Sequence, residues 1–166
     1  MQETKKLKRA ALVLGVVTGI LLLIYLFNTI RMVRSWELYD LEPDFFGGLA
    51  VSPGICISGA VGQFIFIATL IITLTMFISI WRGETPFKRG IVNRLRIIAL
   101  LLVVHEIHNF IIQRIHPLRF YMGEDNFVEI RTSFHGYVIV AGLAIFCVSL
   151  ILQYGITLQT QVDETL

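Results

Sequence analysis

The sequence predicts an all-α integral membrane protein, a four-helix bundle with both termini in the cytoplasm. Hydrophobic residues make up 55% of the 166 residues and only 16% are charged, and the mean hydropathy is +0.75. These values are outside the range of soluble globular domains. Four apolar stretches are each long enough to cross a hydrocarbon core, for which about 20 helical residues suffice. Most of the basic residues lie in the segments predicted on one side of the membrane.

The four stretches form a single membrane domain over residues 1–166, with spans at about 10–30, 55–81, 91–113 and 134–154. Because hydrocarbon offers the backbone no hydrogen-bond partner, each span is expected to be a helix. No strand is predicted. The first span resembles a signal peptide, but no small-residue cleavage site follows it, so we interpret it as a retained anchor.

The orientation follows from the lysines and arginines near the span ends, which favour the cytoplasm. One side has the cluster Lys5, Lys6, Lys8 and Arg9 and the loop residues Arg82, Lys88 and Arg89. The other side has fewer, at Arg31, Arg34, Arg114, Arg119 and Arg131, and these are interspersed with acids. Both termini are therefore predicted to be cytoplasmic.

Two runs of small residues predict close helix packing, which carries much of the contact between helices in lipid. Gly15 and Gly19 lie in the first span, and the second span begins with Gly54, Ser58 and Gly62. We expect these runs to face one another. The alternative is that glycine is simply common in membrane spans.

The loop between the second and third spans is basic. It reads Arg82-Gly83-Glu84-Thr85-Pro86-Phe87, followed by Lys88-Arg89-Gly90-Ile91-Val92-Asn93-Arg94-Leu95-Arg96. Thr85 is predicted to be an N-cap and Pro86 to take the first helical position. The arginines either meet anionic lipid headgroups or form a docking surface for a protein.

At these residues the chain resembles the bacterial DUF2975 family of uncharacterised four-span membrane proteins. The resemblance rests on a Gly-x-x-Pro-Phe element before the third helix with a following Asn and Leu-Arg pair, and on a Gly-x-x-Leu-Gln element with an acidic tail. Here these are Gly83, Pro86, Phe87, Asn93, Leu95 and Arg96, then Gly155, Leu158, Gln159 and Asp163. The resemblance implies no reaction. It implies the bacterial plasma membrane and a cytoplasmic partner such as a helix-turn-helix regulator.

Together with Arg94, these residues are our candidate docking surface. One of the two elements is basic and the other acidic. We therefore expect Arg94 or Arg96 to pair with Asp163 or Glu164, which would hold the tail against the third helix. Such a pair on an exposed surface contributes little to stability.

Ionisable residues inside the third span form the one constellation that suggests chemistry, because charges in a membrane are costly. His105, His108 and Asn109 share one helical face, and Glu106 points to the side. His116 and His135 extend the cluster in the outer half of the bilayer. His105-Glu106-Ile107-His108 is one residue short of the His-Glu-x-x-His zinc motif, so that interpretation is discarded.

Three interpretations of the histidine cluster stay open. The imidazoles ligate a transition metal or haem, they relay protons or sense pH, or they form hydrogen bonds between helices. The leading hypothesis for the whole chain is a non-enzymatic membrane protein without a cofactor, acting in regulation, signalling or immunity through cytoplasmic protein contacts. The alternative is a metal-, haem- or proton-handling protein that uses the cluster. A homo-oligomer is compatible with either, and the net charge of +2 argues against direct nucleic-acid binding.

Overall fold

The computed structural model describes residues 2–39, 49–50, 53–85, 87–115, 118–121, 127–130 and 135–165. Four helices dominate: α1 (Gln2–Tyr39), α2 (Pro53–Trp81), α3 (Arg89–Ile115) and α4 (Gly136–Thr165). Each contains a segment long and apolar enough to cross a membrane, at Lys5–Arg31, Gly59–Trp81, Arg89–Ile112 and Gly136–Thr165. The prediction of four helical spans in a multi-pass membrane protein is confirmed at this level.

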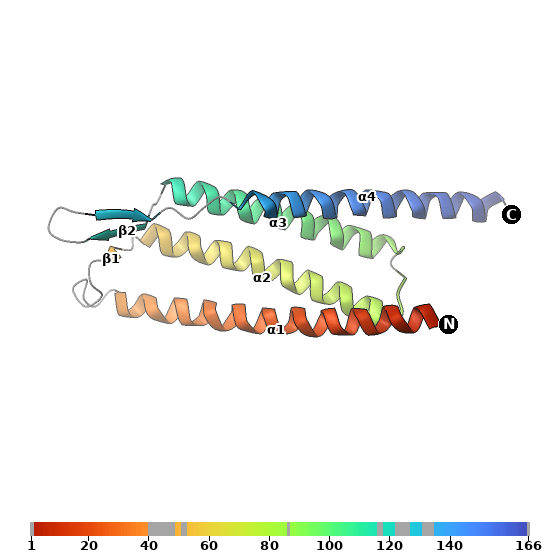
Figure 1. Cartoon of the computed structure of the whole chain (residues 1–166), viewed down its shortest axis with the longest axis horizontal. Coiled ribbons are helices and arrows are strands. Elements are labelled where there is room, and N and C mark those ends of the chain that lie inside the picture. Colours follow the sequence, from red (N-terminus) through yellow and green to blue (C-terminus); the bar gives the residue numbers. More distant parts are fainter. Residues whose placement is uncertain are drawn as a thin grey trace.

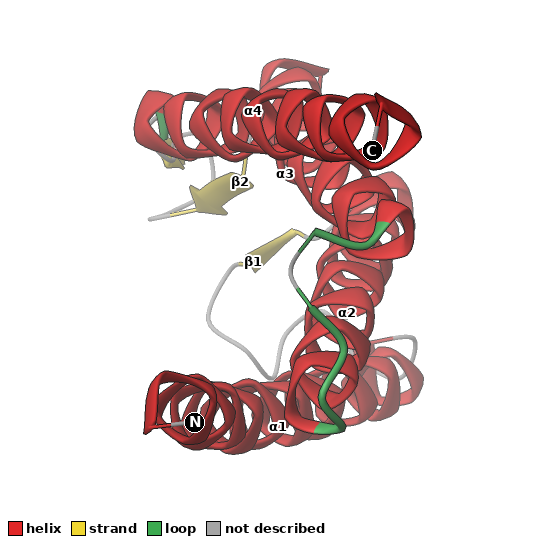
Figure 2. Ribbon diagram, turned by 90° about the vertical axis from the view of Figure 1, so that its right-hand side faces the viewer, coloured by secondary structure: helices red, strands yellow, loops and turns green. Residues whose placement is uncertain are grey.

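The helices run up and down, so both termini lie at the same end of the molecule (Figure 1). Within the described residues α1 packs against α2, α2 against α3 and α3 against α4, with no comparable contact between α1 and α4. Seen from the end, the helices form an open arc with α1 and α4 at its two edges (Figure 2). Each helix therefore packs mainly against its neighbours in the sequence.

Three short strands lie at the end opposite the termini (Figure 1). They are β1 (Leu49–Ala50), β2 (Leu118–Tyr121) and β3 (Phe127–Ile130), paired antiparallel in the order β1-β2-β3. Strand β1 belongs to the connection between α1 and α2, and the other two form a hairpin between α3 and α4. The sequence analysis predicted no strands. These strands link two connections without changing the four-helix arrangement.

Threonine hydroxyls inside the helices find acceptors one turn back along the same helix. Thr18 donates to the carbonyl of Leu14 at 2.8 Å, and Thr69 donates to the carbonyl of Ile65 at 2.9 Å. Thr29 and Thr73 do the same. Because a hydroxyl without a partner is costly in hydrocarbon, this internal bonding lets polar residues remain within apolar spans.

The buried core lies between α2, α3 and α4 towards the end that holds the termini. Its centre is Met76 of α2 with Ile91 and Ile98 of α3. Partly buried side chains pack around it: Ile72, Phe77, Ile80, Leu95, Leu102 and Ile145. By contrast, Leu23 and Ile151, on the two edge helices, are among the most exposed apolar side chains, as expected for surfaces in contact with lipid.

Helices α3 and α4 approach one another closely at Gly142, a buried residue that the sequence analysis did not single out. A Cβ atom there would lie 3.0 Å from the Ala99 carbonyl oxygen and 3.0 Å from Val103 Cγ2. Ser149 of α4, fully buried two turns further on, donates to the Phe146 carbonyl at 2.6 Å. The sequence contained a signal for this contact: Gly142 and Ser149 are small residues seven positions apart, which places them on one helical face.

Where the structure describes their surroundings, at Gly15, Gly19 and Gly62, the predicted glycine runs do not face one another. Gly15 lies against Phe77 of α2, since a Cβ on Gly15 would lie 3.5 Å from Phe77 Cβ, whereas a Cβ on Gly19 would meet nothing within 4 Å. Gly62 instead lies against His108 and Asn109 of α3. Because α1 and α2 are antiparallel (Figure 1), Gly15 lies level with Phe77 towards the end of α2, away from Gly62 near the start of that helix.

Gly54 and Ser58 belong to the first turns of α2, and their surroundings lie outside the part of the chain that the structure describes. Of the five predicted packing positions, Gly15 and Gly62 thus make helix contacts, each with a different partner helix. Gly19 has open space beside it.

Replacing Gly142 by alanine tests the close approach of α3 and α4. The new methyl group would crowd a backbone carbonyl, and overpacking of this kind costs about 1–3 kcal/mol. Gly142→Ala should lower the thermal unfolding midpoint in detergent micelles. Gly19→Ala is the matched control: it enters open space and gains up to about 1 kcal/mol of helix propensity. Equal midpoints for the two variants would contradict the packing described for Gly142.

Candidate functional site

Helix α2 ends in a glycine turn on the same side of the molecule as the termini. The Gly83 amide donates to the Ile80 carbonyl at 3.0 Å, and the Glu84 amide donates to the Ser79 carbonyl at 3.1 Å. This pair of bonds is the Schellman motif, which needs a left-handed residue, and Gly83 has φ +100°. Lys8 of α1 lies beside it, since a Cβ on Gly83 would meet Lys8 Nζ at 3.3 Å. Gly83 therefore ends α2 beside the basic first turns of α1.

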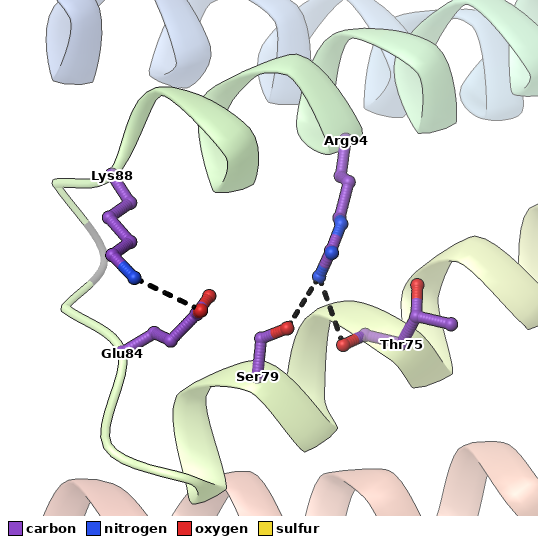
Figure 3. Close-up of polar contacts among 5 residues, drawn as sticks. All are labelled: Thr75, Ser79, Glu84, Lys88 and Arg94. Atoms are coloured by element: carbon purple, nitrogen blue, oxygen red, sulfur yellow. Dashed lines mark hydrogen bonds and ion pairs between the residues drawn. The ribbon is translucent and has the colours of Figure 1, made fainter.

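Helix α3 starts later than predicted. The amides of Ile91 and Val92 donate to the Lys88 carbonyl at 2.9 and 3.2 Å, so Lys88 rather than Thr85 is the residue that caps the helix. Thr85 instead accepts from the Lys88 amide in a separate turn at 3.2 Å. Pro86 lies outside the described residues. An exposed ion pair joins Lys88 to Glu84 at 3.1 Å (Figure 3) and contributes little to stability.

Arg94 joins α3 to α2. Its Nη1 donates to Ser79 Oγ at 2.6 Å and to the Thr75 carbonyl at 3.1 Å, so the guanidinium reaches across the helix interface (Figure 3). These contacts satisfy a charged group near the end of a span with polar atoms of a neighbouring helix. Arg94 therefore has a structural role between helices, which the docking interpretation did not foresee.

Arg96 joins α3 to α4 by donating to Gln153 Oε1. The expected pairing of Arg94 or Arg96 with Asp163 or Glu164 is absent from the described contacts. The reason is the greater length of α4 at this end. Asp163 lies ten residues, or about 15 Å, beyond Gln153 along α4, whereas α3 begins at Arg89, only about 10 Å before Arg96. The acidic residues therefore lie beyond the start of α3 and out of reach of Arg94 and Arg96.

The two elements of the family resemblance meet in space. A Cβ on Gly155 of α4 would contact the Phe87 ring at 3.8 Å, so the aromatic side chain lies against the glycine. Leu95 packs around the core. Exposed side chains complete the set: Asn93, Leu158, Gln159 and Asp163. The structure thus brings Phe87, Arg96 and Gly155 to one end of the α3–α4 contact and leaves the acidic tail extended beyond it.

The predicted polar face of α3 turns towards α2. The His105 ring lies 5.4 Å from the Phe66 ring, and Asn109 Nδ2 is 3.4 Å from a ring nitrogen of His105. Gly62 makes room for His108 and Asn109. Sequence reasoning missed Gln63, whose Oε1 is buried without a hydrogen-bond partner among the described residues. A lone amide in an apolar span was the available signal.

Glu106 points towards the start of α4, whereas His105 and His108 face α2. The residue is 3% exposed, and its Oε1 accepts a hydrogen bond from the His135 backbone amide at 2.6 Å. The Nδ1 atom of His135 is 3.8 Å from the same oxygen. Since α4 begins at Gly136, the carboxyl group of Glu106 caps its first turn, where helix ends leave amides unpaired and favour negative charge.

Within the described part of the chain, no three residues among His, Cys, Asp and Glu are arranged to hold a metal ion. His116 lies outside that part. Glu106 forms a hydrogen bond with the residue before α4, whereas His105 and His108 lie against Phe66 and Gly62 of α2. The metal, haem and proton interpretations of the cluster stay predictions.

Comparison with protein-family models, with curated proteins and with solved structures finds no match for the chain.

Changing Glu106 tests its capping role. Glu106→Leu removes the acceptor and leaves the His135 amide without a partner, which costs about 1–3 kcal/mol. Hydrogen exchange at the start of α4 should become faster than in the parent, while exchange in α1 stays unchanged. Glu106→Gln keeps a carbonyl acceptor of nearly the same shape and should restore slow exchange. Parent-like exchange at His135 in Glu106→Leu would show that the carboxyl group does not hold this helix start.

Proposed function

We propose that the chain is a non-enzymatic, multi-pass protein of the bacterial plasma membrane, of the DUF2975 type, which acts through protein contacts on its cytoplasmic face. The partner is a cytoplasmic protein such as a helix-turn-helix regulator, and the role is in regulation, signalling or immunity. The observation that carries this proposal is the last part of α4, residues 155–165, which we name the α4 projection.

The α4 projection extends beyond what a span requires. Helix α4 has 30 residues, whereas about 20 cross the hydrocarbon core. The last ten residues of α4 are mostly polar, and the helix runs past the other helices at its end (Figure 1). Under this proposal, the projection stands in the cytoplasm as a helix whose side chains are exposed from Leu158 onward.

Two apolar side chains are exposed on one side of the α4 projection. Leu158 is 42% exposed and Val162 is 56% exposed, and their spacing of four residues places them on the same helical face. Asp163 and Glu164 beside them are also exposed. An apolar stripe with acidic neighbours, outside the hydrocarbon, suits a helix that lies in the groove of a partner protein.

The distribution of basic residues supports the same proposal. The termini and the turn at Gly83 lie at one end of the molecule, together with Lys8, Arg82 and Lys88. Lysines and arginines near span ends favour the cytoplasmic side. The α4 projection would then stand beside the basic loop, facing soluble regulators.

Reporter fusions test the orientation. A fluorescent protein fused to either terminus should be fluorescent, because this reporter matures in the cytoplasm. Alkaline phosphatase fused at the same positions should be inactive, because it is active only after export. Phosphatase inserted after Asp125, in the connection between α3 and α4, should be active. Active phosphatase at both termini would show that the termini lie outside the cytoplasm, and this result would contradict a cytoplasmic docking surface.

Affinity capture tests the docking surface itself. The variant Leu158→Ser with Val162→Ser should lose the cytoplasmic partner that the parent captures from solubilised membranes. Thr160→Ser with Gln161→Ser changes the same turns of the helix without touching the apolar stripe and should retain the partner. If both double variants capture the same proteins as the parent, the stripe is not the docking surface.

A further inference from the structure

A groove between α3 and α4 contains two adjoining cavities that share Arg96. The first is about 280 Å³ and is lined mostly by polar side chains, among them Arg89, Asn93, Arg96, Gln153 and Thr157. The second is about 370 Å³ and is lined mostly by apolar side chains, among them Ile97, Leu100, Leu143 and Phe146. Each has a volume close to the lower end of small-molecule sites, which run from about 300 to 1,000 Å³.

The groove changes character along the span. On α3, Arg89, Asn93 and Arg96 are followed by Leu100 and Val103 at steps of three or four residues, which places all of them on one side of the helix. On α4, the polar Gln153 and Thr157 lie towards the termini, and Leu143 and Phe146 lie towards the middle of the span. The groove is therefore cationic at its mouth and apolar deeper in the membrane.

The charge in the polar cavity is positive and uncompensated by its lining. Two arginines contribute to it, and no carboxylate is among the lining residues. Gln153 accepts from Nη2 of Arg96 and holds the guanidinium beside the cavity. Guanidinium groups without a counter-charge favour an anionic ligand, because they bind phosphate and carboxylate oxygens well. An anionic oxygen is therefore the group that complements this lining.

The apolar cavity determines what kind of anion fits. Leu100 and Leu143 beside it are 62% and 55% exposed, on the surface of spans that lipid surrounds. A free anion would occupy only the polar cavity. An amphipathic molecule places its charge at Arg89 and Arg96 and its chain along Leu100 and Leu143.

We propose that this groove is a binding site for an anionic phospholipid. The phosphate accepts hydrogen bonds from Arg96 and Arg89, Asn93 and Thr157 contact the polar headgroup, and one acyl chain lies in the apolar cavity. Basic pockets between helices at the cytoplasmic surface bind anionic headgroups in this way. The site overlaps the α4 projection only at Ile156 and Thr157, whereas the exposed Leu158 and Val162 line neither cavity, so lipid binding does not require a protein partner.

Lipid titration of the full chain in a neutral detergent tests the site, with bound lipid counted by native mass spectrometry. Dioleoyl phosphatidylglycerol should bind about tenfold more tightly than dioleoyl phosphatidylcholine, which has the same chains. Arg89→Gln should weaken phosphatidylglycerol binding about fivefold, from the loss of one cation. Arg82→Gln is the control, since Arg82 is exposed at the same end of the molecule and lines neither cavity.

Circular dichroism of each variant checks that the helices are intact, so that weak binding is not a sign of unfolding. Glycerol 3-phosphate, which is the headgroup without chains, should neither bind nor displace the lipid. Three results would overturn the proposal: equal affinity for the two lipids, equal weakening by Arg82→Gln and Arg89→Gln, or saturation of the site by glycerol 3-phosphate alone.

Discussion

The contact between α3 and α4 is the interaction on which both candidate sites depend. At one end Glu106 caps the start of α4, and in the middle Gly142 lies against the Ala99 carbonyl. Towards the termini Arg96 binds Gln153, and Phe87 lies against Gly155. Because lipid gives apolar helices no hydrophobic reason to associate, close packing and hydrogen bonds of this kind hold the pair together. The same contacts shape the groove between α3 and α4 and determine how far α4 extends beyond the start of α3.

The polar residues of the spans are placed according to the same constraint. Threonines bond to their own helix, Arg94 bonds to α2, and Glu106 bonds to the backbone at the start of α4. Each removes an unsatisfied group from hydrocarbon, where it would be costly. Arg96 differs, since it lines a cavity that holds a second arginine and no carboxylate and that adjoins an apolar cavity. That difference separates a structural arginine from one suited to a ligand.

Much of the fold could be predicted from composition and periodicity. The four spans, and the face shared by His105, His108 and Asn109, follow from hydropathy and from the helical repeat. The contact partners could not be predicted in this way. Gly62 packs against α3 and not α1, and the arginines of α3 contact Ser79 and Gln153 rather than the acidic tail. Which residues meet depends on the direction and length of each helix, and local patterns contain neither.

By itself, the sequence determined that this chain is a four-span helical membrane protein with its basic residues gathered at one end, because apolar length and charge bias act on each segment separately. Only the tertiary structure decided that α3 and α4 enclose a groove with a cationic mouth, that Glu106 caps another helix, and that Leu158 and Val162 are exposed on a projection. These features come from the register between antiparallel helices of unequal length, which is set by side-chain packing across the whole molecule.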